Sequence, residues 1–246
     1  MKKPFGKLAV AAVLTGFSIL FYWLQITIFH RPDQSGFYFF QDLAFLPLQV
    51  LFVTLILDGI MKAREKRERL DEINIVVSAF FSELGSEAIR RMNPFITNPE
   101  GILDRLQISG AYASGDFKSA ADAVMRYPFH ADSRAGNLME TSDFLYGKKD
   151  MILGMFQNPN LLENNRFTSM LWAVYHVMDE FKNREDFSSL PGTDLDHLSG
   201  DIERAYRLLV VEWIFYMKHL NEKYPYLFSL ALRKSPFSGN YSAVVR

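Results

Sequence analysis

The chain has 246 residues, of which 49% are hydrophobic, and it carries no cysteine and a formal charge of −1. This length accommodates one or two domains, and the composition excludes a disordered, collagen-like or disulfide-stapled chain. The absence of cysteine also excludes thiolate catalysis and cysteine-ligated zinc or iron–sulfur sites. The charges are unevenly distributed, because residues 8–29 and 43–57 contain none.

The N-terminal part of the chain, residues 1–61, is predicted to be a transmembrane helical hairpin with spans at about 8–29 and 38–60. The first apolar stretch has 22 residues, which as a helix rise roughly 33 Å and cross a hydrocarbon core of about 30 Å. A cleaved signal peptide is the alternative, but its apolar region is shorter and ends at small residues. The stretch here runs on through Tyr22, Trp23 and Gln25, which favours a retained anchor.

The basic residues predict the orientation of this hairpin. Three lysines precede the first span, five basic residues follow the second, and the link at roughly residues 31–36 holds only Arg31. Because basic residues concentrate on the cytoplasmic side, we expect a multi-pass protein of the inner (plasma) membrane with both termini in the cytoplasm. The five basic residues after the second span are expected to contact lipid headgroups. They are Lys62, Arg64, Lys66, Arg67 and Arg69.

Polar residues in the spans are candidate functional positions, because polar groups in lipid are costly and tend to face protein or water. They are Gln25, Asp42, Gln49 and Asp58. Hydrogen bonds between the two helices are the simpler interpretation, and a water-lined path in an oligomer is the alternative. Pro47 predicts a kink in the second span.

Residues 62–93 are predicted to form a basic collar and a juxtamembrane helix that continues the second span to about Met92. The apolar residues Leu70, Ile73, Val77, Phe80 and Leu84 recur at a helical spacing. This stripe predicts packing against the rest of the chain, with a coiled coil as the alternative.

Residues 94–246 show no sustained apolar–polar alternation, so we expect an all-α cytoplasmic domain with bundle-like packing. Short helices are expected at 102–108 and 117–126, followed by an exposed loop at 130–137 and a helix at 141–156. Apolar stripes predict two longer helices over 167–181 and 195–220, and a last helix is expected at 226–233.

Four segments resemble a group of uncharacterised two-span membrane proteins of bacteria and archaea. They are DLAFLPLQVLFVTLIL at 42–57, NPNLLENNRFTSMLWAVYHVMDE at 158–180, DLDHLSGDIERAYRLLVVEW at 194–213 and YMKHLNEKYPYLFSLALRKSPF at 216–237. The resemblance covers most of the chain and implies a prokaryotic inner-membrane protein. It implies no activity, because none is associated with the group.

The helical domain offers groups of side chains that suit a metal ion or acid–base chemistry. They are His176 with Asp179 and Glu180, His197 with Asp201, and Glu212 with His219. His176 and Asp179 are three residues apart and His197 and Asp201 are four apart, so each pair shares a helix face. Facing helices can bring His176, His197 and Asp201 around one ion, since imidazole and carboxylate suit several metals. A local ion pair is the simpler interpretation of each pair.

The favoured function is a membrane-anchored interaction, signalling or scaffold module that binds a protein partner or itself. The alternatives are a subunit of a small oligomeric channel or transport component, and a helical metal-binding domain. No nucleotide-binding, nucleophile-elbow or HExxH motif is present, so neither an enzyme activity nor a cofactor is predicted. Residues 70–246 hold 18 basic and 23 acidic side chains, which argues against nucleic acid as a partner.

Overall fold

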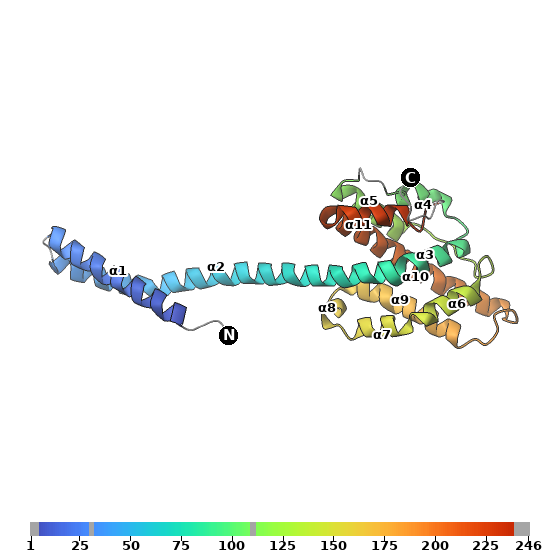
Figure 1. Cartoon of the computed structure of the whole chain (residues 1–246), viewed down its shortest axis with the longest axis horizontal. Coiled ribbons are helices and arrows are strands. Elements are labelled where there is room, and N and C mark those ends of the chain that lie inside the picture. The colour runs from blue at the N-terminus through green and yellow to red at the C-terminus, as the bar shows by residue number, and fades with distance from the viewer. Residues whose placement is uncertain (1–4, 30–31, 109–111, 239–246) are drawn as a thin grey trace. The chain divides into compact units, whose positions relative to one another are not determined.

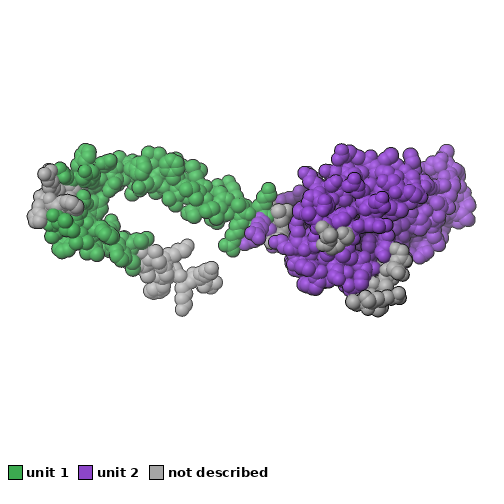
Figure 2. Space-filling view, turned by 90° about the horizontal axis from the view of Figure 1, so that it is seen from above, with its two compact units in different colours: residues 1–66 green, residues 67–246 purple. Residues whose placement is uncertain are grey.

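The structure is a computed structural model that describes residues 5–29, 32–108 and 112–238. The chain divides into two units, Met1–Lys66 and Arg67–Arg246 (Figure 2). Lys2, Lys3 and Arg31 lie outside the described residues, as do the side chains of Lys7, Arg69 and Leu70. The described ranges contain helices and no strand, which confirms the all-α prediction.

The first unit is a helical hairpin of α1 (Phe5–Phe29) and the beginning of α2 (Pro32–Phe80) (Figure 1). The Tyr22 hydroxyl of α1 donates a hydrogen bond of 2.9 Å to a carboxylate oxygen of Asp42 on α2. The predicted link through residue 36 is wrong, because α2 already begins at Pro32. Proline suits the first turn of a helix, where its missing N–H has no intrahelical partner in any case. Pro47 lies inside α2.

The hairpin exposes apolar side chains along both helices. Among the described residues, one helical run, Gly36–Phe95, is long and apolar enough to cross a bilayer, and none of its most apolar 18-residue window is buried. The described apolar stretch of α1, Val13–Ile28, is shorter. The apolar side chains of both helices are therefore largely uncovered within the described part of this unit.

The C-terminal part of α2 enters the core of the second unit. Ile73 and Val77 are almost fully buried there and Phe80 and Leu84 completely so, which confirms the prediction that this stripe packs against the rest of the chain. The helical run continues, as predicted, to Met92, through a π-helical turn η1 (Phe81–Gly85) and α3 (Ser86–Met92), and ends in the 3₁₀ turn η2 (Asn93–Phe95).

The π turn was not predicted. A π turn inserts an extra residue into a helix, and here the adjacent side chains of Phe80 and Phe81 both lie in the core and pack edge to face.

The rest of the second unit consists of further helices (Figure 1). They are α4 (Glu100–Leu106), α5 (Ser114–Arg126), α6 (Leu138–Gly147), α7 (Lys149–Phe156), α8 (Pro159–Leu162), α9 (Asn165–Lys182), α10 (Gly192–Lys223) and α11 (Pro225–Arg233). The long α10 packs against α3, α5, α9 and α11. Its inner face and that of α9 are buried, as the apolar stripes predict.

Two local predictions are wrong. The expected helix at 141–156 is two helices, because the backbone leaves the helical conformation at Lys148. The expected exposed loop at 130–137 contains Ser133, which is 1% exposed. The Ser133 hydroxyl donates to the carbonyl of Leu195 at 2.8 Å, and its N–H donates to the Ser199 hydroxyl at 2.9 Å. These two hydrogen bonds therefore hold the loop against the beginning of α10.

Candidate metal centre

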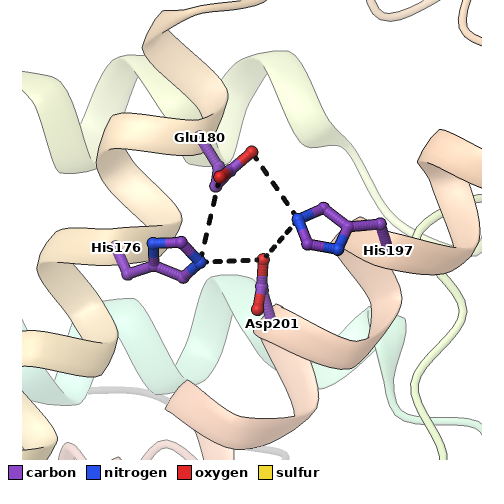
Figure 3. Close-up of side chains that lie close together, drawn as sticks. All are labelled: His176, Glu180, His197 and Asp201. Carbon is purple, nitrogen blue, oxygen red and sulfur yellow. Dashed lines mark ion pairs between the residues drawn. The ribbon is translucent and has the colours of Figure 1, made fainter.

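Two histidines and two carboxylates converge where α9 and α10 pack together (Figure 3). His176 and Glu180 lie one turn apart on α9, and His197 and Asp201 lie one turn apart on α10. Residues four apart share a helix face, so each helix presents one imidazole and one carboxylate to the other.

The distances within this cluster resemble those of a coordination shell. Nε2 of His176 and Nε2 of His197 each lie 3.2 Å from Oδ2 of Asp201. The same nitrogens lie 3.9 and 3.8 Å from the carboxylate oxygens of Glu180. All four ligand atoms lie within 4.8 Å of one another. Atoms bound to one zinc ion at about 2.1 Å are roughly 3–4 Å apart, so small side-chain movements suffice to enclose an ion.

Asp201 lies on the buried side of the cluster. Its side chain is 3% exposed, and its buried Oδ2 atom has no hydrogen-bond partner although both histidine nitrogens are near it. A buried carboxylate oxygen is costly unless it is hydrogen-bonded or faces a cation. The side chains of His176 and His197 are 45% and 54% exposed, so the cluster opens to solvent on the histidine side.

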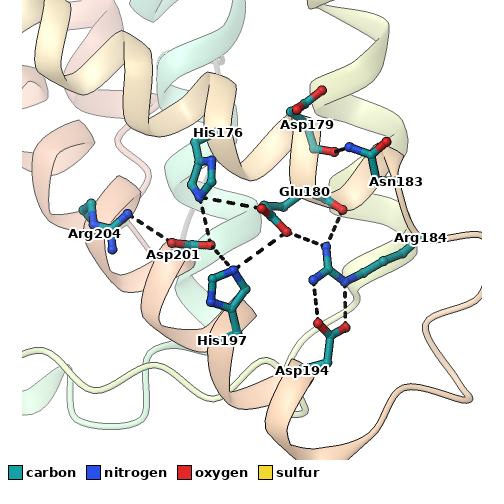
Figure 4. Close-up of polar contacts among 9 residues, drawn as sticks. All are labelled: His176, Asp179, Glu180, Asn183, Arg184, Asp194, His197, Asp201 and Arg204. Carbon is teal, nitrogen blue, oxygen red and sulfur yellow. Dashed lines mark hydrogen bonds and ion pairs between the residues drawn. The ribbon is translucent and has the colours of Figure 1, made fainter.

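Two arginines hold the carboxylates of the cluster (Figure 4). Arg204 donates to Oδ1 of Asp201 at 3.1 Å. Arg184 donates to Oε2 of Glu180 at 2.7 Å, and this hydrogen bond is the main cause that lowers the pKa of Glu180. Arg184 also binds Asp194, whose hydrogen bonds raise the pKa of the guanidinium further. Glu180 is therefore kept ionised, and such partners orient the ligands of a metal site.

The chemistry of the four side chains fits a divalent first-row transition metal. Imidazole and carboxylate together suit Zn²⁺, Fe²⁺ and Mn²⁺, whereas Ca²⁺ and Mg²⁺ prefer sites built from oxygen alone. Four protein ligands hold one ion and leave room in its coordination shell for further ligands when the ion accepts five or six.

The structure brings together the three predicted residues, His176, His197 and Asp201, and adds Glu180. Asp179, which the three-residue spacing favoured, is exposed and directs its carboxylate away from the cluster (Figure 4). The available sequence signal is a repeated pattern, His-x-x-x-Glu on one helix and His-x-x-x-Asp on the next. Glu212, grouped with His219 in the sequence, is instead buried in an ion pair with Arg166.

The polar positions of the hairpin fall into three settings. Gln25 and Asp42 line an open hollow of about 560 Å³ together with Tyr22. Asp58 forms an ion pair of 2.8 Å with Lys62 one turn further along α2. Gln49 is exposed, and so are the other predicted headgroup contacts whose side chains are described, Arg64, Lys66 and Arg67.

Comparisons of the sequence with family models and with known proteins agree on one family. The model of the N-terminal helical domain of MJ1433 matches residues 2–61, and that of the C-terminal helical domain of the uncharacterized protein MJ1433 matches residues 69–233. The uncharacterized protein MJ1433 of Methanocaldococcus jannaschii is 38% identical over 238 residues, which cover 97% of this chain and 95% of that protein. No solved structure matches.

Proposed function

This chain belongs to the MJ1433 family, and we propose that it is a membrane-anchored protein whose second unit binds one divalent transition-metal ion. The relative's name assigns it no activity, so the proposal rests on the geometry of this chain. It comprises binding and no catalytic step.

One observation above all supports metal binding. Oδ2 of Asp201 is buried without a hydrogen bond, and two imidazole nitrogens and the Glu180 carboxylate are directed at the same point (Figure 3). A local ion pair on α10, the simpler interpretation of the sequence, explains only His197, which lies 3.2 Å from that oxygen, and leaves the approach of His176 and Glu180 from α9 unexplained. A cation between the four groups accounts for all of them and gives the buried oxygen a partner.

Exposed apolar side chains support the membrane part of the proposal. The segment of α2 after Gly36 is long enough to span a bilayer, and basic residues flank the hairpin at both ends. We place both termini in the cytoplasm, with the hairpin in the inner membrane. Because Asp42 is already bound by Tyr22 within the hairpin, packing between helices is favoured over a water-lined channel.

The predicted interaction or signalling role fits a metal-dependent module. An ion bound by His176 and Glu180 on α9 and by His197 and Asp201 on α10 cross-links two helices that are joined by the segment 183–191. Metal binding then stabilises one arrangement of α9 relative to α10. A protein partner or a second copy of the chain that contacts these two helices therefore binds the metal-loaded and the metal-free forms with different affinities.

The metal proposal is tested on full-length protein in detergent, purified without a histidine tag, stripped with a chelator and titrated with Zn²⁺ by calorimetry. We expect one ion per chain, and a loss of affinity of roughly 100-fold in Asp201→Asn. The matched control is Asp179→Asn, which changes an exposed acid on α9 outside the cluster and should bind normally. Equal affinity of Asp201→Asn and wild type would overturn the proposal.

The membrane proposal is tested by labelling single cysteines, which the cysteine-free chain allows without background. Gln34→Cys lies at the beginning of α2 and Ser114→Cys at the beginning of α5, and both positions are exposed. In intact spheroplasts, a membrane-impermeant maleimide should label Gln34→Cys, and label Ser114→Cys only after permeabilisation. Equal labelling at both positions before permeabilisation would refute the orientation.

A further inference from the structure

We infer that the metal-loaded cluster binds a phosphate group, held jointly by the ion and by the guanidinium of Arg204. The inference rests on the proposed metal function and names the class of ligand that this site accepts.

The cluster leaves one side of a bound ion open. Asp201 closes the inner side, while the two histidines that flank it are about half exposed. An ion that prefers five or six ligands therefore completes its shell from solvent, next to the histidines. An oxygen of an exogenous anion is able to replace water at these positions.

Metal binding also changes the sign of the local charge. Without an ion, the carboxylates of Glu180, Asp201 and Asp194 outnumber the guanidinium groups of Arg184 and Arg204 by one. A divalent ion bound by neutral histidines reverses this, because two positive charges are added and one excess positive charge remains. Asp179 directs its carboxylate away from the cluster (Figure 4). The loaded site therefore favours an anion.

The two arginines differ in whether their N–H groups remain available to bind a further ligand. Arg184 is 13% exposed and is fully engaged by Glu180 and Asp194. Arg204 is 62% exposed, and among the described residues its one polar contact is Oδ1 of Asp201. In Figure 4 the two guanidinium groups approach the cluster from opposite sides. Arg204 thus presents further N–H donors to solvent beside the predicted ion.

A phosphate group suits this pair of partners better than a carboxylate does. A guanidinium binds two oxygens in parallel, and a carboxylate has no third oxygen for the metal. A tetrahedral phosphate has oxygens for both. Free phosphate and the headgroup of a phosphatidic acid share this chemistry, and a membrane-anchored domain has access to either.

The test uses full-length protein in detergent, loaded with Co²⁺, whose visible absorption reports a change of ligands. Inorganic phosphate should shift the cobalt spectrum and bind in calorimetry, and metal-free protein should bind it at least ten-fold more weakly. Arg204 also orients Asp201, so phosphate is titrated into Arg204→Met protein at saturating Co²⁺, where it should bind at least ten-fold more weakly than to cobalt-saturated wild type. Arg105→Met, which removes an exposed arginine on α4, should behave as wild type.

The outcomes separate the two proposals. If wild-type protein binds no cobalt, the metal function fails and the phosphate inference with it. If cobalt binds but phosphate neither binds nor depends on Arg204, only the phosphate inference is overturned. A second titration uses short-chain phosphatidic acid in place of phosphate. Tighter binding of the lipid assigns the site to a headgroup, and tighter binding of inorganic phosphate assigns it to the free anion.

Discussion

Arg184, just after α9, holds Asp194 near the beginning of α10 in a two-pronged ion pair. Its Nε and Nη2 atoms donate to the two carboxylate oxygens of Asp194 at 2.7 and 2.6 Å. Its Nη1 atom donates to the carbonyl and carboxylate of Glu180 at 2.6 and 2.7 Å. One side chain therefore joins the ends of the two helices that carry the candidate metal ligands and fixes the position of Glu180.

Replacement of this arginine should affect both stability and metal binding. Arg184→Met leaves two carboxylates without their cation, and because both are about a quarter exposed, solvent screens part of the loss. We expect the Tm of metal-free protein to fall by about 2–6 °C. Zn²⁺ affinity should fall roughly ten-fold, since the partner that orients a ligand is lost. Thermal unfolding followed by circular dichroism measures the first effect and calorimetry the second. A stable Arg184→Met protein with normal zinc affinity would contradict this role.

Glu212 gives a prediction about pH. It is 2% exposed on α10, and burial raises its pKa despite the opposing attraction of Arg166. A raised pKa means that the folded protein disfavours the charged form. Glu212 therefore lowers the free energy of unfolding at pH values above its raised pKa. This loss of stability is recovered as the pH falls toward about 4.3, the pKa of a glutamate in the unfolded chain.

Two variants test this prediction. Glu212→Gln removes the buried charge and keeps an oxygen that accepts from Arg166, so it should gain stability relative to wild type more at pH 7.5 than at pH 4.5. Glu212→Ala loses that contact and leaves a cavity, so it should be less stable than Glu212→Gln at both pH values. Melting temperatures of the variants and the wild type at the two pH values measure these effects. If Glu212→Gln and wild type differed in melting temperature by the same amount at both pH values, the charge of Glu212 would not be the cause of the difference.

Much of the second unit was predictable because burial of one helix face imposes a repeat of 3.6 residues on the sequence. The apolar residues of α9 and α10 follow this repeat, so both helices were predicted from it. Features that depend on contacts between distant segments leave no such repeat. The π turn follows from the burial of both Phe80 and Phe81, and the buried Ser133 depends on the backbone of α10 that it meets.

The metal cluster was partly predictable for the same reason. Spacing along one helix shows which histidine and acid share a face, and it identified His197 with Asp201. It does not show which faces of α9 and α10 meet. The choice of Glu180 over Asp179 depends on the rotation of α9 about its own axis, and this rotation is set by the packing of residues such as Val174 and Val177 in the core.

The hydrogen bond from Tyr22 to Asp42 predicts the strength of the hairpin. A hydrogen bond between helices in a membrane is worth roughly 0.6–2 kcal/mol, so Tyr22→Phe should weaken association of α1 with α2 by about that amount. Dyes on Gly16→Cys and Gly59→Cys, positions with open space around them, report helix separation by energy transfer during titration with sodium dodecyl sulfate. Tyr38→Phe, from the same hollow, is the control. A midpoint unchanged by Tyr22→Phe would show that the hydrogen bond contributes nothing.

Two glycines should respond in opposite directions to alanine, because one meets a buried ring and the other meets solvent. A Cβ atom at Gly136 would lie 2.5 Å from the ring of Phe95, which is fully buried and has no room to move, so Gly136→Ala should cost about 1–3 kcal/mol. Gly200 lies within α10 with nothing near its missing Cβ. Gly200→Ala should therefore stabilise the protein by about 0.5–1 kcal/mol, since glycine is a poor helix former. Thermal unfolding of the two variants measures both effects, and a stabilising Gly136→Ala would show that the loop at 131–137 is not packed against Phe95.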